Sequence, residues 1–334
     1  MKIFISGIAG FLGSHLADYF MQLGHEVCGN DSLIGGYLEN VPDGAEFHQI
    51  DCTYLNSMVK LTKGCDIIIH AACTAYEGLS VFSPHLVTQN TFQITSTMLS
   101  AAIQNNVKRF VYCSSMARYG AQDTLPFTED MVCRPQDPYG IAKYAAEMLV
   151  ATLCRTHGLE HVICVPHNII GARQKFNDPY RNVAAIMTNL MLQKRQPIIY
   201  GDGTQKRCFS FVQDCVYCIG QAALRDDVVG ETFNIGPDTE FISINELAAT
   251  LADILDFDLD PIYLPDRPQE VRFATCSADK ARRMLGYKAN VTLREGLMDL
   301  VDFIRRLGTR KFRYHLDVEI VNEKTPRSWT DRMF

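Results

Sequence analysis

The sequence has no long hydrophobic run: no apolar stretch approaches the roughly 20 residues that a transmembrane helix needs, so a membrane-spanning protein is not expected. It also has no excess of positive charge. The 32 Lys and Arg residues stand against 38 Asp and Glu residues, which gives a net charge of −6. Because acids and bases are interspersed, this balance argues against nucleic acid or an anionic membrane as the main partner. An anionic small ligand in a locally basic pocket is still compatible with it.

The chain contains no Gly/Ser-rich linker, no internal repeat and no low-complexity segment that would mark a domain boundary. Its 334 residues suggest one large or two modest domains. No signal peptide is expected, because the first strand begins at Lys2. The 12 cysteines lie in core-like runs, and the pair Cys215 and Cys218 has no second pair at zinc spacing. Reduced, buried thiols in a cytoplasmic protein with no metal site are therefore predicted.

A glycine-rich turn follows the first predicted strand. Lys2–Ser6 is a short apolar run typical of a buried parallel strand. Gly7, Gly10 and Gly13 follow it and open an amphipathic segment. Strand, glycine turn and helix in this order predict a phosphate site, since glycines permit close backbone approach and a helix N-terminus attracts an anion. Asp31 ends the second predicted strand, where a carboxylate binds ribose hydroxyls and repels a 2′-phosphate, so NAD is favoured over NADP.

Strands and helices alternate regularly through the first half, which predicts a doubly wound α/β fold with a parallel sheet. Ligands bind such sheets at the carboxyl ends of the strands. Several chemically useful or small residues fall at such ends: Gly7, Asp31, Asp51, Ala71 and Ser115. The segments expected to form the strands of this sheet are Lys2–Ser6, Glu26–Asp31, Glu46–Ile50, Asp66–His70, Arg109–Ser114 and His161–Val165.

Tyr139 and Lys143 lie four residues apart at the start of a predicted helix, so both side chains face the same way. A phenol ordinarily loses its proton near pH 10, and a nearby ammonium lowers that pKa. We therefore expect Tyr139 to act as a general base near neutral pH, with the Ser115 hydroxyl polarising a substrate oxygen. A packing tyrosine and a solvated lysine are the alternative for this spacing taken alone.

The second half of the chain has a less regular pattern and is interpreted as a smaller mixed α/β lobe. We expect residues 1–167 to form the dinucleotide-binding domain. Residues 168–334 are expected to form mainly a substrate-binding lobe that interleaves with it. The locally basic tail from Thr309 onward is interpreted as a solvated surface.

These motifs together resemble the extended short-chain dehydrogenase/reductase family, in its NAD-dependent nucleotide-sugar epimerase/dehydratase branch, and most of all the UDP-glucose 4-epimerase-like members. The resemblance covers roughly Met1 to Leu300 and is more specific for the family than for the substrate. It rests on the glycine turn Gly7–Gly13, on Asp31, on the segments 70–72, 112–120 and 138–143, and on Gly201-Asp202-Gly203 followed by Arg207.

The resemblance implies a role for each matching residue. Ser115, Tyr139 and Lys143 match the catalytic groups, and Lys143 also holds the nicotinamide ribose. The residues implied for NAD are Gly7, Gly10, Phe11, Leu12, Gly13, Asp31, Asp51, Cys52, Ala71, Ala72, Asn90, Tyr139, Lys143 and Pro166. Those implied for the nucleotide sugar are Ser115, Asn168, Asn182, Val183, Tyr200, Arg207, Arg267 and Glu270. Arginine suits the diphosphate because its planar guanidinium binds phosphate in a bidentate manner.

Two departures from the family pattern narrow the activity. Met116 and Ala117 stand where the family's dehydratases carry an acidic pair, and neither side chain can move a proton. We therefore expect a C4 epimerase acting through a 4-keto sugar, on UDP-glucose and UDP-galactose or on N-acetylated or uronate forms. Ala274 replaces a bulky residue, and is predicted to leave room for an N-acetyl group.

Two other functions remain open at this point. One is an oxidoreductase with net hydride transfer, or a dehydratase, of the same family. The other is a non-catalytic regulator that binds NAD or a nucleotide sugar, since a fold does not settle a function. The resemblance also implies a homodimer, with Ser83–Asn105 and Tyr139–His157 as its contact helices.

Overall fold

Seven parallel strands form the centre of the computed structural model, which describes residues 1–334. Their order is β3-β2-β1-β4-β5-β6-β11, and the winding direction reverses between β1 and β4. This is the predicted doubly wound α/β arrangement, and it is confirmed. The strands are β1 (Lys2–Ser6), β2 (Glu26–Asp31), β3 (Glu46–Gln49), β4 (Ile67–His70), β5 (Arg109–Cys113), β6 (Glu160–Pro166) and β11 (Thr232–Ile235).

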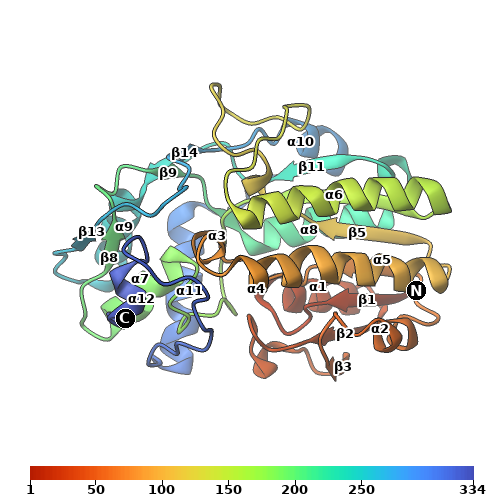
Figure 1. The fold of residues 1–334 in the computed structure, drawn as a ribbon, viewed down its shortest axis with the longest axis horizontal. Coiled ribbons are helices and arrows are strands. Elements are labelled where there is room, and N and C mark those ends of the chain that lie inside the picture. Colours follow the sequence, from red (N-terminus) through yellow and green to blue (C-terminus); the bar gives the residue numbers. More distant parts are fainter.

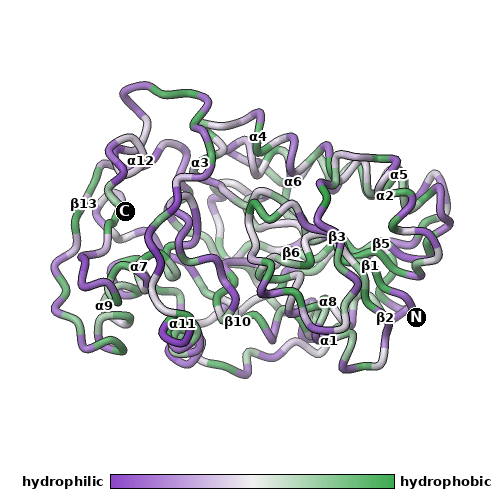
Figure 2. The backbone as a smooth tube through the Cα atoms, turned by 90° about the horizontal axis from the view of Figure 1, so that it is seen from below, coloured by the Kyte–Doolittle hydropathy of each residue, from purple (hydrophilic) through white to green (hydrophobic).

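Helices cover both faces of this sheet, which explains why its central strands are almost continuously apolar. Ile3 and Ile5 pack into one core cluster with α1 (Phe11–Gln22) and α8 (Val212–Leu224). Phe4, between them, packs into the opposite cluster. That second cluster includes residues of α2 (Leu55–Leu61), α5 (Ile94–Gln104) and α6 (Pro138–His157). Figure 1 shows α5 and α6 crossing one face of the sheet, and Figure 2 shows hydrophobic segments along β1 and β5.

The helix predicted over Ser83–Asn105 is interrupted. The structure has α4 (Pro84–Thr88), then a π-helical turn over Gln89–Gln93, then α5. Asn90 within this turn departs from helical geometry, with φ −81° and ψ 16°. Its carbonyl accepts a hydrogen bond from the backbone N–H of Thr74, at 3.2 Å. A π turn widens the helix locally and is common at functional sites, and Asn90 lines the cavity described below.

The second half of the chain forms a smaller lobe, on the left in Figure 1. Its core is a cluster built mainly from three helices. However, α8 and β11 return to the main sheet, where β11 pairs with β6. The division at residue 168 stays a prediction. The lobe's elements are β7 (Ile169–Ile170), α7 (Val183–Leu192), β8 (Ile198–Tyr200), β9 (Lys206–Arg207), β10 (Ser210–Phe211), β12 (Ile242–Ser243), α9 (Ile244–Leu255), β13 (Ile262–Leu264), β14 (Phe273–Ala274) and α11 (Leu293–Leu307), with α10 (Asp279–Leu285) beside β11.

The tail from Thr309 onward is only in part the solvated surface that we expected: Lys311 and Arg313 are exposed, but the segment around Trp329 is not. Trp329, on the short α12 (Arg327–Thr330), is buried, and its indole N–H donates to the carbonyl of Pro179 at 3.1 Å. Trp329 packs with Phe82 and Tyr180 in a separate aromatic cluster. The apolar residues of the tail outweigh its few cations, because burying one large aromatic ring stabilises more than solvating a lysine. No helix of the chain has the length and apolar character needed to cross a bilayer.

Candidate functional site

Two adjoining cavities, of about 300 and 260 Å³, open along the carboxyl ends of the parallel strands and the neighbouring lobe. All fourteen residues predicted to bind the dinucleotide line the first cavity. Of the predicted substrate residues, Ser115, Asn168 and Asn182 line the first cavity. Val183, Tyr200, Arg207, Arg267 and Glu270 line the second, together with Asn168 and Asn182. The fold thus brings every predicted site residue into one continuous cleft. The residues that line both cavities are Ala75, Glu77, Asn168, Arg181 and Asn182.

The glycine turn forms one wall of the first cavity. Gly7 has φ +78°, and a Cβ there would come within 3.0 Å of the Ala72 backbone. A Cβ on Gly13 would overlap the carbonyl oxygen of Gly7. Gly10 caps α1 without any side-chain hydrogen bond, so the helix N-terminus keeps free N–H donors toward the cavity. A cradle that only glycine allows, with an uncapped helix N-terminus, fits the pyrophosphate of a dinucleotide.

Acidic and polar groups line the other end of this cavity. Asp31 is buried at the end of β2, and its carboxylate accepts a hydrogen bond from the Leu33 N–H at 2.7 Å. Burial raises the pKa of Asp31, while backbone N–H groups and the Arg181 charge oppose that change. Asp51 accepts from the Thr53 N–H at 2.7 Å, and Asn30 donates to the Cys52 sulfur at 3.1 Å. The buried Asn30 Oδ1 has no partner within the chain. These carboxylates and this free acceptor fit ribose hydroxyls and an adenine amino group.

The helix that carries Tyr139 and Lys143 starts where Pro138 and Asp137 place it. Pro138 occupies the first turn, where no backbone N–H is needed. Asp137 is the N-cap, and its side chain accepts from the Gly140 N–H at 2.9 Å. Burial, and then the nearby Glu77 carboxylate, raise the pKa of Asp137 to about 7. The cap therefore fixes the direction in which Tyr139 enters the cleft.

Tyr139, Lys143 and Ser115 meet in the first cavity. The Lys143 ammonium is buried and donates to the carbonyl of Cys113 at 2.7 Å. It lies 5.9 Å from the centre of the Tyr139 ring and 5.0 Å from that of Tyr112. Cys113 O is its only hydrogen-bond acceptor within the chain. The remaining N–H donors of this buried cation are therefore free for a ligand.

The acidity of Tyr139 differs from our expectation. Burial raises its pKa above the usual range, and the nearby Cys73 thiol acts in the same direction. Lys143 and the Ser115 hydroxyl lower it, as predicted, but they do not outweigh burial. In the protein by itself, burial therefore opposes the phenolate that we expected near neutral pH, because transferring a phenolate out of water is more unfavourable than the nearby Lys143 ammonium is favourable. The role of Tyr139 as the general base stays a prediction.

A buried ion pair supports the loop that carries Ser115. Arg118 contacts Glu147 of α6 at 3.0 Å, and the Ser114 hydroxyl donates to the other oxygen of Glu147. The Ser115 hydroxyl accepts from the Ala117 N–H at 3.2 Å. Ser115 is therefore held against α6, the same helix that carries Tyr139 and Lys143.

The second cavity contains the predicted arginines. Glu270 pairs with both of them, at 3.2 Å to Arg267 and 3.8 Å to Arg207. The Arg267 guanidinium lies over the Tyr200 ring, 4.7 Å from its centre. Asn182 caps α7 and has φ +59°, which turns the chain into the cleft. Two cations and an aromatic face in one cavity suit a diphosphate joined to a planar base.

Several residues of this cleft were not predicted from the sequence, and three of them matter for its charge and shape. Glu77 and Arg181 line both cavities, and Phe334 lines the second. The first two follow predicted features closely: Glu77 comes shortly after β4, and Arg181 directly precedes Asn182. Phe334 belongs to the tail, whose Ser328 hydrogen-bonds the Tyr200 hydroxyl. The sole Trp of the sequence, Trp329, was the available signal that this tail is buried.

One predicted feature lies elsewhere. Ala274 is on β14, buried beside β9, and lines neither cavity. The structure therefore gives no support to the prediction that Ala274 makes room for an N-acetyl group. No group of three or more His, Cys, Asp and Glu side chains is placed to hold a metal ion.

The sequence matches a model of the NAD dependent epimerase/dehydratase family over residues 3–236. UDP-glucose 4-epimerase of Mycolicibacterium smegmatis is 30% identical over 314 residues, which span 91% of this chain and 99% of the relative. The crystal structure of Thermotoga maritima UDP-glucose 4-epimerase with UDP-glucose is 31% identical, with a TM-score of 0.86, covering 92% of this chain and 99% of that chain. That of Bacillus cereus UDP-glucuronic acid 4-epimerase with UDP-glucuronic acid and NAD is 26% identical, also with a TM-score of 0.86, covering 92% and 100%.

Proposed function

The chain belongs to the NAD dependent epimerase/dehydratase family, and we propose that it interconverts the C4 epimers of a UDP-sugar, with NAD as a tightly held cofactor. The observation that carries this proposal is the position of Tyr139, Lys143 and Ser115 in the first cavity, close to its junction with the arginine-containing second cavity. A hydride acceptor in the first cavity and a sugar diphosphate in the second would meet at these three residues. Similarity to UDP-sugar 4-epimerases supports the same reaction.

The first cavity would hold NAD with its pyrophosphate on the N-terminus of α1 and its adenosine end near Asp31 and Asp51. Lys143 would bind the nicotinamide ribose with the donors that the protein leaves free. When bound, oxidised NAD supplies a positively charged ring that accepts a hydride from C4 and returns it. The other steps fall to side chains of this chain.

Tyr139 accepts the proton of the sugar 4-hydroxyl, and Ser115 bridges the phenol and that oxygen by hydrogen bonding. Lys143 favours the phenolate, in opposition to burial. After the hydride has left C4, the sugar is a 4-keto sugar, which turns so that its other face meets the cofactor. Tyr139 then returns the proton to the oxygen, and the product is the C4 epimer with no net redox change.

Arg207 and Arg267 bind the diphosphate, and Tyr200 covers the base. Glu270, which pairs with both arginines, orients them and binds the nucleotide ribose. Asn168 and Asn182 line both cavities and contact the sugar between them. The nucleotide therefore stays fixed while the sugar turns.

The residues after Ser115 do not support a dehydratase. Ala117 is buried, and the Met116 sulfur accepts a hydrogen bond from the Asn168 amide at 3.7 Å. Neither side chain can donate or remove a proton, and elimination of water requires both. The cleft is therefore suited to proton and hydride transfer at C4.

We also propose a homodimer and a cytoplasmic location. Ile141 and Met148 on α6 are about half exposed, at 51% and 58%, and Phe92 beside them is 39% exposed. Such apolar side chains on adjacent helices fit a contact between two copies. All twelve cysteines are free thiols, as in proteins of a reducing compartment. Light scattering of wild type and of Met148→Glu tests the dimer: the variant should shift toward monomer.

The activity is tested by incubating the purified protein with UDP-glucose, UDP-galactose and their N-acetylated forms, without added NAD. NMR should show C4 interconversion of at least one pair. Interconversion that starts only with stoichiometric NAD, accompanied by NADH formation, would identify a net oxidoreductase instead. No reaction with any of these sugars, with or without NAD, would contradict the proposal.

A further inference from the structure

Glu77 is the first residue of the short helix α3 (Glu77–Ser80) and lines both cavities. Figure 1 shows α3 where the main sheet and the smaller lobe meet. The carboxylate has no hydrogen bond and no ion pair within the chain. The Ser80 hydroxyl donates to the backbone carbonyl of Glu77 and not to its side chain. Glu77 is thus an unpartnered acid that is accessible from the cleft.

The positively charged side chains near Glu77 form ion pairs with another carboxylate. Glu77 is exposed to the cleft, but the protein atoms around it partly desolvate its carboxylate and raise its pKa, while Arg207 and Arg267 lie close enough to oppose this change. Both arginines already pair with Glu270. Asp137 lies on another side, at the start of α6, and adds negative charge. When a diphosphate engages the arginines, Glu77 keeps no cation of its own in this part of the cleft.

The sugar of a nucleotide sugar must lie at this junction, because it connects the diphosphate to the carbon that reacts at Tyr139. A uronate carries its carboxylate on C5, the ring carbon next to C4. That carboxylate would therefore enter the region that Glu77 faces, and two carboxylates in a partly desolvated cleft repel each other strongly. The hydroxymethyl group that a hexose carries on C5 in place of this carboxylate has no charge, and its hydroxyl can instead donate a hydrogen bond to Glu77.

We propose that Glu77 makes the cleft selective for nucleotide sugars with an uncharged hexose and excludes the corresponding uronates. This inference rests on the proposed function and narrows its substrate class. Arg181, the cation that also lines both cavities, does not cancel the effect. Its guanidinium donates at 2.7 Å to the carbonyl of Gly35, which lines only the first cavity, so this donor is held on the dinucleotide side.

The test is a set of binding measurements by calorimetry at pH 8, on the NAD-loaded Tyr139→Phe protein, in which turnover does not interfere. The ligands are UDP-glucose, UDP-N-acetylglucosamine and UDP-glucuronate. With Glu77 present, the uronate should bind at least about tenfold more weakly than UDP-glucose. Adding Glu77→Gln, which keeps the shape and removes the charge, should bring the two dissociation constants within about threefold of each other. Asp302→Asn, on the outer face of α11, removes the same charge far from the cleft and should leave the ratio unchanged.

Two results would count against the inference in different ways. Equal binding of UDP-glucose and UDP-glucuronate with Glu77 present, and an unchanged ratio in Glu77→Gln, would overturn the role of Glu77 and leave the proposed function intact. Failure of all three UDP-sugars to bind the NAD-loaded protein would overturn the proposed function, and the inference with it.

Discussion

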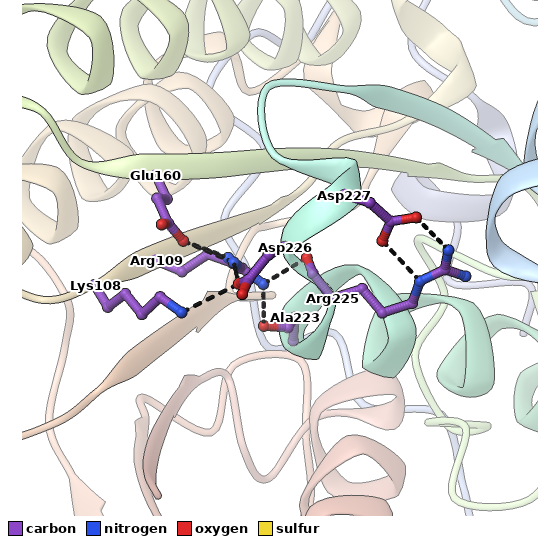
Figure 3. Close-up of polar contacts among 7 residues, drawn as sticks. All are labelled: Lys108, Arg109, Glu160, Ala223, Arg225, Asp226 and Asp227. Carbon is purple, nitrogen blue, oxygen red and sulfur yellow. Dashed lines mark hydrogen bonds and ion pairs between the residues drawn. The ribbon is translucent and has the colours of Figure 1, made fainter.

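A buried cation lies at each end of strand β5, and the two cations differ in how many of their N–H donors have acceptors. Arg109, at the first residue of β5, is 1% exposed, and all of its guanidinium N–H groups have acceptors. Figure 3 shows this network, in which Glu160 and Asp226 take the charge, while Ala223 and Arg225 contribute carbonyl oxygens from the end of α8. Lys143 is also 1% exposed, but its ammonium has a single acceptor, the carbonyl at the last residue of β5.

This difference in hydrogen bonding indicates that one end of β5 contributes to stability and the other end to function. A buried cation whose donors are all satisfied joins β5, β6 and α8 and has nothing left to offer a ligand. A buried cation with free N–H donors destabilises the folded protein, and a bound ligand that accepts hydrogen bonds from these donors removes that destabilisation. We therefore expect the amino end of the sheet to determine stability and the carboxyl end to determine activity.

The largest effect should come from Tyr139→Phe, which removes the proton acceptor and keeps the ring. Epimerisation should fall by roughly 10³-fold, while the free energy of unfolding should change by about 1 kcal/mol or less. Turnover by NMR and urea unfolding measure the two quantities. If stability fell together with activity, Tyr139 would have a structural role, and the assignment of activity rather than stability to this end of the sheet would be contradicted.

A smaller effect should follow from loosening the tail over the second cavity. Deleting residues 332–334 removes Phe334 from the cavity wall and keeps the buried Trp329 and Ser328, the partner of the Tyr200 hydroxyl. KM for the UDP-sugar should rise by roughly 5–20-fold, with kcat nearly unchanged, since the tail contacts neither Tyr139 nor Lys143. Ser328→Ala alone should show the same trend more weakly. An effect on kcat without one on KM would contradict this role.

The smallest effect is a pH dependence at the start of α6. The pKa of Asp137 is raised from 3.8 to about 7, so the folded protein binds this proton more tightly than the unfolded chain. Its contribution to stability is therefore complete below about pH 4 and is lost as the pH rises to about 7. Relative to Asp137→Asn, which keeps a cap for Gly140, wild type should lose on the order of 2 kcal/mol over that range. Urea unfolding of both proteins between pH 4 and 8 measures it, and parallel curves would contradict the raised pKa.

The sheet and most of the site were predictable because their signals are local. Gly7, Asp31 and Ser115 each end or follow a strand, and parallel strands bring their carboxyl ends together wherever the helices lie. The positions of Arg207 and Arg267 came from the family resemblance, since an isolated arginine in a sequence carries no comparable signal.

What the sequence did not reveal depends on contacts between distant segments. Glu77 becomes a cleft residue only when β9 and the segment around Arg267 approach α3. The tail becomes a cavity wall only when Trp329 reaches the carbonyl of Pro179. The burial of Tyr139, which raises its pKa, was not predictable for the same reason: the position of Lys143 is encoded in the helix, but the depth of burial depends on the whole fold.

The most direct test of this account is to compare Arg109→Met with Lys143→Met, measuring unfolding free energy and turnover in excess NAD for both. Arg109→Met should lower stability by roughly 2–4 kcal/mol, because it leaves carbonyls and carboxylates unpaired, and the folded fraction should keep its activity. Lys143→Met should change stability by about 1 kcal/mol or less, because an underpaired charge is replaced by an apolar chain, and turnover should fall by roughly 100-fold or more. The reverse pattern, or equal losses of stability and activity in both variants, would contradict it.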